Sequence, residues 1–363
     1  MGDGMRPIPF GELVRRIFGE YRKEGTIFGV PQAQFFRKRN TQKIKIFGES
    51  CDTPLGPAAG PHTQLAQNII SAYLTGGRFF ELKTVQKLDQ LKISKPCIEA
   101  ADEGYNCEWS TEFTLEKAYD EYLKAWILLH LLEEVFDFRA TETRSFIFNM
   151  SVGYDLEGIQ TPKMDAFISK MLDSSHEARF QRYLDEVDTL ARDKVFLKER
   201  GLESKRENLA RLSGKISPCL SPSVTLSTMH GCPPSEIEAI CRYFLTGKKI
   251  HTFVKLNPTL LGYSTVTQIL RSLGFSDLAL REESFQKDLQ YEDAVSMLQR
   301  LRGAAEQGGC VFGVKLTNTL AAINHKDYLP EKEIYMSGRA LFPLSIHLAA
   351  KLSREFGGHL PIS

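Results

Sequence analysis

The sequence lacks the cysteine spacing of a metal or cluster site. No two cysteines form a Cys-x-x-Cys pair, and the remaining spacings do not repeat. Iron–sulfur clusters and structural zinc sites need several closely placed ligands. We therefore expect no metal site and no cluster in this chain, and expect reduced thiols. The seven cysteines are Cys51, Cys97, Cys107, Cys219, Cys232, Cys241 and Cys310.

A strong net charge and a long apolar run are also missing. The formal net charge is +1, which leaves no long-range field to attract a nucleic acid or an anionic membrane. The longest apolar stretch, residues 125–132, includes His130 and is far shorter than the roughly 20 residues of a membrane span. Residues 1–9 lack the apolar core of a secretory signal. We expect a cytoplasmic protein whose partners are a small-molecule substrate and other proteins.

Short strand-like runs alternate with helical patterns along the chain. This alternation is typical of a parallel sheet or barrel. It predicts an α/β fold of the TIM (β/α)₈ type that ends after the start of the seventh strand. The expected strands are residues 54–59, 78–84, 145–151, 224–228, 252–256 and 311–317, and a last run that begins at Leu360.

The rest of the chain is assigned around this barrel. Residues 1–53 are expected to form an N-terminal extension with a hairpin near 42–49, and residues 54–363 the incomplete barrel. Two helical insertions are expected at about 87–140 and 161–214. The first contains an amphipathic helix at 114–136. The second is densely charged and predicts a solvated helical hairpin against the barrel, with a partner-binding arm as the alternative.

Helix boundaries are clearest after the fourth strand and near the end of the chain. Pro233 and Pro234 suit the start of a helix, and Gly247 is expected just past its end. A last helix is expected at 343–356, before Gly357 and Gly358. The apolar stripe of the helix after the fourth strand consists of Ile237, Ile240, Cys241, Phe244 and Leu245.

Polar residues end several of the predicted strands. In a parallel barrel the carboxyl ends of the strands face the active site. Paired ammonium groups suit the N1–C2=O edge of a flavin, and asparagine amides suit a pyrimidine-like ring. A solvated rim is the alternative for a single lysine. These strand-end residues are Glu81, Lys83, Thr84, Asn149, Ser151, Lys255, Asn257, Thr317, Asn318 and Thr319.

Two loops add further candidates. The loop after the first strand contains the small residues Ala58, Ala59 and Gly60, which let backbone amides approach a flat ligand. A tight turn explains these small residues equally well. At the end of the fourth strand, Thr228 and Cys232 offer a hydroxyl and a thiol for proton transfer. A buried structural thiol is the alternative for Cys232, and a zinc site with His230 is disfavoured for lack of ligands.

Six short segments, in order, resemble the family of dihydroorotate and dihydropyrimidine dehydrogenases. Residues 54–60 resemble the first-strand loop and 79–85 the flavin-lysine strand of the dihydroorotate enzymes. TLSTMHG at 225–231 resembles NLSCPHG of dihydropyrimidine dehydrogenase, and TFVKLNP at 252–258 resembles FFAKLTP. TNTL at 317–320 resembles TNTV, and SGRALFP at 337–343 resembles SGTAIRP. The chain also resembles the N-terminal part of a large subunit named for selenate reduction, from the same superfamily.

The resemblance implies an FMN barrel that oxidises or reduces a small nitrogenous ring. It implies that iron–sulfur and FAD or NAD(P) modules lie downstream, and that the FMN phosphate site, after strands seven and eight, is incomplete in this chain. By position it implies flavin contacts from Ala58, Ala59, Gly60, Lys83, Thr84, Asn149, Lys255, Ser337 and Gly338. Substrate contacts are implied for Thr225, Asn318 and Thr319.

Two positions depart from the resemblance. Thr228 stands where the dihydropyrimidine enzyme has its catalytic cysteine, and Thr225 stands in place of an asparagine. A hydroxyl at the first position has a parallel in dihydroorotate enzymes that use serine, and Cys232 is the other candidate for proton transfer. The alternative interpretation is a non-catalytic barrel that serves as a docking module in a redox complex.

Overall fold

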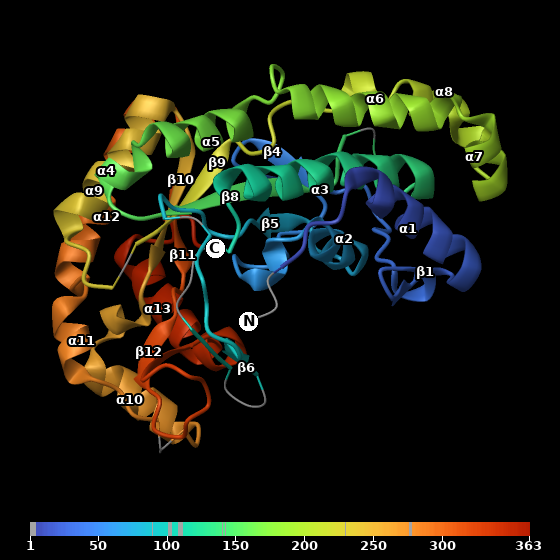
Figure 1. The fold of residues 1–363 in the computed structure, drawn as a ribbon. Helices are drawn as coiled ribbons and strands as arrows, with labels where there is room; N and C mark the ends of the chain where they lie inside the picture. The colour runs from blue at the N-terminus through green and yellow to red at the C-terminus, as the bar shows by residue number, and fades with distance from the viewer. Residues whose placement is uncertain are drawn as a thin grey trace.

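A curled parallel sheet forms half of a barrel at the centre of the molecule (Figure 1). The computed structural model describes residues 5–88, 90–100, 104–107, 112–139, 141, 143–228, 230–275 and 278–363. The spatial order of the strands is β11–β10–β9–β8–β5, all parallel, which confirms the predicted fold class. The strands are β5 (Phe79–Glu81), β8 (Ile147–Gly153), β9 (Ser223–Ser227), β10 (His251–Leu256) and β11 (Phe312–Leu316).

The first and last predicted strands lie along the two edges of this sheet. The segment 54–59 is not a regular strand, because Pro54 and Pro57 have no N–H to donate. Its Leu55 carbonyl still accepts hydrogen bonds from the N–H groups of Arg78 and Phe79. At the other edge, Ile362 bridges Val314 in parallel. The sequence order of all seven segments is therefore their spatial order.

A bulge follows β5, between Glu81 and the bridge at Val85. Glu81 pairs with Asn149, whereas Val85 pairs with Val152, so four steps on one segment oppose three on the other. One extra residue at 82–84 re-aims the side chains at the strand end, as bulges beside functional sites often do.

The N-terminal hairpin closes the bottom of the half barrel. The hairpin expected near 42–49 consists of β3 (Ile44–Ile46) and β4 (Glu49–Cys51). Phe47 and Gly48 between them both have positive φ, 54° and 76°, as a two-residue type I′ turn requires. The Phe47 ring packs against Phe79 and Phe253.

Two layers of helices cover the side of the barrel near the N-terminus (Figure 1). The inner helix α3 (Leu115–Phe136) was expected to be amphipathic, and that prediction is wrong, because nearly all of its side chains are buried. The outer layer covers the face that would otherwise meet solvent, and the charged residues inside are paired, as Lys124 is with Glu121. The surrounding helices are α1 (Phe10–Glu24), α2 (Ala66–Leu74), α5 (Pro162–Leu172), α6 (Ala178–Arg192), α7 (Lys194–Arg200) and α8 (Arg206–Ala210).

The remaining helices flank the second half of the sheet. In α9 (Pro234–Arg242) the predicted apolar stripe is buried, which confirms its inward face. Gly247 does not end this helix, because the chain continues in a π-helical turn, η5 (Tyr243–Lys248), and Lys249 takes the left-handed conformation instead. The others are α4 (Leu156–Ile159), α10 (Tyr263–Ser272), α11 (Glu282–Lys287), α12 (Tyr291–Gly308) and α13 (Phe342–Glu355), which ends before Gly357 as predicted.

An antiparallel sheet that the sequence did not predict lies beyond the carboxyl ends of β10 and β11 (Figure 1). Its strands are two to four residues long and come from two distant parts of the chain, so no alternation pattern reveals them. Their order is β12 (Leu320–Ile323), β13 (Glu333–Met336), β7 (Tyr105–Asn106) and β6 (Ile98–Glu99). A separate short pair joins β1 (Thr26–Ile27) to β2 (Val30–Pro31). Among the described residues, no helix has the length and apolar character needed to cross a membrane.

Candidate functional site

A largely buried group of three charges lies inside the half barrel. Glu81 on β5 forms ion pairs with Lys255 on β10, with Oε1 and Nζ 3.1 Å apart, and with Lys315 on β11, with Oε2 and Nζ 3.2 Å apart. The exposed fractions of the three side chains are 1%, 9% and 15%. We call this group the lysine–glutamate triad.

The triad carries a net positive charge. Burial alone would raise the pKa of Glu81, but Lys255, Lys315 and the Ala59 N–H outweigh burial and lower this pKa to about 2. The carboxylate is therefore ionised at neutral pH. One carboxylate balances only one of two ammonium groups, and an unbalanced buried charge is costly. An anionic group on a ligand would complete the neutralisation.

Strand register explains why these three side chains meet. Residues two apart on a strand face the same side, so Glu81 and Lys255 lie one layer above Phe79 and Phe253. Lys255 and Lys315 are direct partners across β10 and β11. Sequence reasoning selected Lys255 but missed Lys315. The sequence signal was the tripeptide Val-Lys-Leu, which occurs in both strands.

Asn149 and Thr225 are joined to each other across neighbouring strands. Asn149 Nδ2 donates to Thr225 Oγ1 at 2.7 Å, and Ser223 Oγ donates to Asn149 Oδ1 at 2.7 Å. All three side chains are buried. These hydrogen bonds fix the orientation of the Asn149 amide.

Lys83 and Thr84 lie at the bulge of β5. The Thr84 and Ser151 hydroxyls are 2.8 Å apart, and the Lys83 carbonyl accepts from the Tyr122 hydroxyl on α3 at 2.9 Å. The Lys83 side chain is 7% exposed. Burial and, to a lesser extent, the nearby Lys83 charge lower the pKa of His62, although a hydrogen bond to the Ala58 backbone opposes them. Lys83, a third lysine besides Lys255 and Lys315, therefore lies close to His62 in the loop after the first edge segment.

The loop after the first edge segment touches the triad directly. The Ala59 N–H donates to Glu81 Oε2 at 3.1 Å, while Ala58 is exposed on the same loop. A Cβ on Gly60 would lie 2.5 Å from the His62 ring, so a larger residue there would require this ring to move. The small residues serve a tight turn, and the same turn places a backbone amide at the triad.

Thr228 and Cys232 line one small cavity together with Lys255. The cavity measures about 10 Å³, space for roughly one water molecule. Burial, followed by Glu236 and Asp155, raises the pKa of Cys232 to about 11. The thiol is therefore protonated at neutral pH. The structure brings both predicted proton-transfer residues close to Lys255.

Asp288 organises the loop that carries His230, and sequence reasoning missed it. This carboxylate is 4% exposed. It accepts from the Gly231 N–H at 2.6 Å and the Thr259 hydroxyl at 2.8 Å, and its Oδ2 lies 3.1 Å from His230 Nδ1. Burial alone would raise the pKa of Asp288, but these partners lower it. Asn257 also donates to this carboxylate at 3.0 Å.

The predicted residues near the end of the chain fall in two places. The Asn318 amide approaches the Thr228 carbonyl at 3.4 Å, and half-buried Thr319 follows it before β12 begins. Ser337 and Gly338 follow β13, where the Ser337 N–H donates to the Gly104 carbonyl at 2.9 Å. The structure thus brings Asn318 to Thr228 and to the Leu256 carbonyl, and places Ser337 and Gly338 just after β13.

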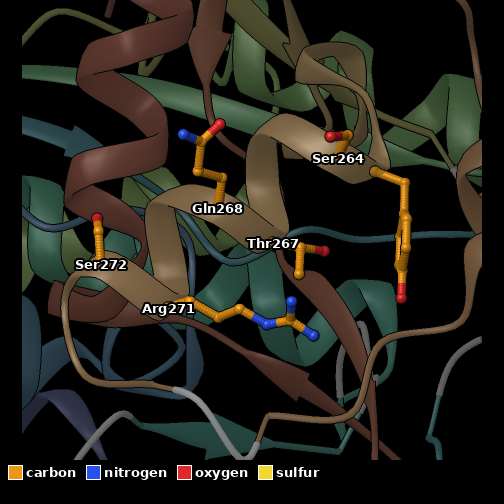
Figure 2. A pocket seen from close by; sticks show the side chains of 6 residues that line it. Ser264, Thr267, Gln268, Arg271 and Ser272 are labelled. Atoms are coloured by element: carbon orange, nitrogen blue, oxygen red, sulfur yellow. The ribbon is translucent and has the colours of Figure 1, made fainter.

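A larger depression lies elsewhere, on the outer face of α10 (Figure 2). Its volume is about 700 Å³, but every lining residue comes from this single helix. It holds one charged side chain, Arg271. An open helix face of this kind lacks the converging polar groups of a catalytic site. The other lining residues are Tyr263, Ser264, Thr267, Gln268 and Ser272.

Comparison with known proteins places the chain in a family. Residues 28–363 match the family "Oxidoreductase YgfK, N-terminal TIM-barrel domain". The chain is 59% identical over 363 residues to the provisionally named oxidoreductase YgfK of Escherichia coli strain K12, and equally to its namesake in Escherichia coli O157:H7. These matches cover 100% of this chain and 35% of each relative. The chain therefore belongs to the family of the N-terminal TIM-barrel domain of oxidoreductase YgfK.

Proposed function

We propose that this chain is the FMN-binding barrel of an oxidoreductase that acts on a small nitrogenous ring of the pyrimidine or purine type. The observation that carries the proposal is the lysine–glutamate triad, with its net positive charge inside the barrel. The family is named for an oxidoreductase, which supports redox chemistry of this general kind.

The charge of the site suits a flavin. Reduction places negative charge at the N1–C2=O edge of the ring, and the ammonium group that Glu81 does not balance would neutralise it. Backbone amides of Ala58 to Gly60, Lys83 and Thr84 lie at the same strand ends, and we assign them, with Asn149, Ser337 and Gly338, to FMN binding. The cavity beside Thr228 accommodates only water, so the flavin ring would lie outside this cavity.

The chain's own residues supply the proton chemistry. A bound flavin would supply the hydride-accepting N5 position. The Thr228 hydroxyl is the first candidate for moving the proton on the substrate carbon, because it lies beside Lys255. Cys232 is protonated at neutral pH, so it suits proton donation rather than abstraction. We assign Thr225, Asn318 and Thr319 to the substrate side.

Electrons would pass through parts of the protein beyond this chain. The chain spans 35% of the length of the relatives it matches. We propose that iron–sulfur and FAD or NAD(P) modules in such a longer protein exchange electrons with this barrel, and that the whole functions in the cytoplasm.

One observation favours a second candidate, a non-catalytic docking barrel. Glu81 already engages both Lys255 and Lys315, so the triad also works as an internal brace. A brace of this kind needs no ligand. The two candidates differ in whether the protein holds flavin.

Flavin occupancy tests the proposal. We would record the visible spectrum and identify the released cofactor for two proteins. One is this chain, and the other is a longer protein that contains this chain and is as long as the relatives. Stoichiometric FMN in the longer protein, reduced at least tenfold by Lys255→Met or Lys315→Met, supports the proposal. Lys170→Met, at a surface ion pair, is the matched control and should retain FMN. A colourless longer protein, or equal FMN in all variants, overturns the proposal, and the first outcome favours the docking barrel.

A further inference from the structure

Two cysteines face each other across the hairpin of the antiparallel sheet. In β6 and β7, Ile98 pairs with Asn106 and Glu99 with Tyr105. One step further along, Cys97 stands opposite Cys107, and the Cys107 N–H donates to the Cys97 carbonyl at 3.0 Å. Side chains directly opposite in an antiparallel pair project on the same face. Both cysteines are free thiols in this structure.

The spacing of this pair allows a disulfide. Cα atoms of a hydrogen-bonded antiparallel pair are about 5.5 Å apart, and disulfides bridge Cα atoms about 4.4–6.8 Å apart. The Cβ atoms of a cross-strand pair, at about 4.5–5.5 Å, are further apart than the roughly 3.8 Å average for disulfides. A bond formed here would carry some strain, which makes a disulfide easier to reduce again.

The surroundings of the two thiols differ. Lys95 Nζ donates to Cys97 Sγ at 3.5 Å, and Cys97 is partly exposed. A neighbouring ammonium attracts the negative charge that a sulfur carries when it attacks a disulfide. Cys107 is 4% exposed, and burial, followed by the adjacent Cys97 sulfur, raises its pKa. These surroundings favour Cys97 as the attacking thiol and Cys107 as the resolving one.

We propose that Cys97 and Cys107 form a reversible dithiol–disulfide site that reacts with low-molecular-weight disulfides of the glutathione type. Cys97 sulfur, having lost its proton, attacks one sulfur of glutathione disulfide, and the departing glutathione takes up a proton. Cys107, on losing its proton, then attacks the Cys97 sulfur and displaces the second glutathione. Two protein thiols are oxidised to one disulfide, and one glutathione disulfide is reduced to two thiols.

The hairpin is connected to the candidate functional site. Asn106 pairs with Tyr335 of β13, and the Gly104 carbonyl accepts from the Ser337 N–H. The Tyr335 ring stacks on His230, with ring centroids 5.9 Å apart. Oxidation would link β6 to β7, the strand that pairs with β13 just before Ser337 and Gly338. The dithiol site itself does not depend on flavin binding.

Redox titration of the intact chain tests the proposal. Samples equilibrated at graded ratios of glutathione to its disulfide would be quenched with acid, alkylated, digested and analysed by mass spectrometry. We expect a pair of peptides joined by a disulfide between Cys97 and Cys107. This pair should disappear when the ratio of glutathione to its disulfide is raised again to a reducing value. Cys219 and Cys310, also partly buried, are internal controls and should remain alkylated throughout.

Variants separate the two steps. Cys107→Ser should accumulate glutathione at Cys97, and Cys97→Ser should leave Cys107 unmodified. Lys95→Met should slow disulfide formation about tenfold, whereas Lys92→Met, at an exposed neighbouring lysine, should not. No bond between Cys97 and Cys107 at the most oxidising ratio, or equal oxidation of Cys219, would overturn the proposal. Both of these readouts use the natural sequence. They therefore test the proposal even if one of the variants fails to fold.

Discussion

At the scale of single residues, Glu81 links the stability of the fold to pH. Its pKa is about 2 in the folded protein, compared with 4.5 for an ordinary glutamate. A lowered pKa contributes stability above the ordinary value and loses it as the pH falls toward 2. We expect the free energy of unfolding to fall by on the order of 3 kcal/mol from this group between about pH 5 and 2. Urea denaturation across this range measures it.

Glu81→Gln provides the control for this pH dependence. The variant leaves the buried Lys255 ammonium and the partly exposed Lys315 ammonium without a carboxylate, so it should be less stable at pH 7 by about 3–5 kcal/mol. Its stability should also fall less steeply below pH 5. Adding Lys315→Met removes one ammonium and should restore part of the loss. An acid profile of Glu81→Gln parallel to that of the natural sequence would contradict the role given to this carboxylate.

Asp288 is expected to hold the loop around His230. Asp288→Asn replaces an oxygen acceptor with an amide that cannot accept at both positions, so the Gly231 N–H or the Thr259 hydroxyl loses its partner. We expect a loss of about 2–3 kcal/mol in the free energy of unfolding. Asp173→Asn, at an exposed carboxylate, should change it far less. Equal effects of the two substitutions would show that the buried hydrogen bonds contribute little.

The sequence predicted these site residues unevenly, for a physical reason. Lys83, Asn149 and Lys255 end apolar strands, and the rule that strand ends face the active site selects them without a structure. Asp288 lies between helices α11 and α12, where no periodicity marks it, and reaches His230 across 58 residues. A contact between residues so far apart in sequence depends on how the intervening loops fold back against the barrel. The charge balance of the triad also required Lys315, whose place depends on register.

At the scale of elements, the hairpin β3–β4 closes the barrel through one side chain. Phe47 is 4% exposed and packs on Phe79, Phe253 and the His251 ring. Phe47→Ala should lower the free energy of unfolding by about 3–5 kcal/mol, because it leaves a cavity at the barrel floor. Urea denaturation followed by circular dichroism measures the change.

Ile44 on the same hairpin is the matched control. Its side chain is 39% exposed, so Ile44→Ala should cost less than about 1 kcal/mol. If both substitutions had the same small effect, the hairpin would be a surface attachment and not the floor of the barrel.

Which elements could be predicted depended on their length and burial. The five central strands are largely buried and rich in apolar residues, and the sequence located each within a few residues. The antiparallel sheet was missed because β6 and β7 have two residues each. The helix α3 was found, but its environment was not, since a second layer of helices buries polar positions that normally face solvent. The periodicity of a local segment does not show which strand it pairs with or whether other helices cover it.

At the scale of the whole molecule, the half barrel has two edges that differ from its interior strands. Edge strands with unpaired backbone groups invite association with other chains. Here both edge segments contain proline, Pro57 on one side and Pro361 on the other, and proline removes a donor from each edge. The segment 360–363 also covers β11, through hydrogen bonds between Val314 N–H and the Pro361 carbonyl and between Leu316 N–H and the Ser363 carbonyl.

Removing residues 360–363 should therefore expose the edge of β11. We expect the shortened chain to lose about 2–5 kcal/mol of unfolding free energy, mainly from buried Leu360, and to aggregate at lower temperature. Leu360→Ala is the matched control, because it removes the side chain and keeps the backbone bonds. Both variants should lose similar stability, but only the deletion should scatter light strongly on heating. If Leu360→Ala aggregates as readily as the deletion, instability rather than an open edge drives the association.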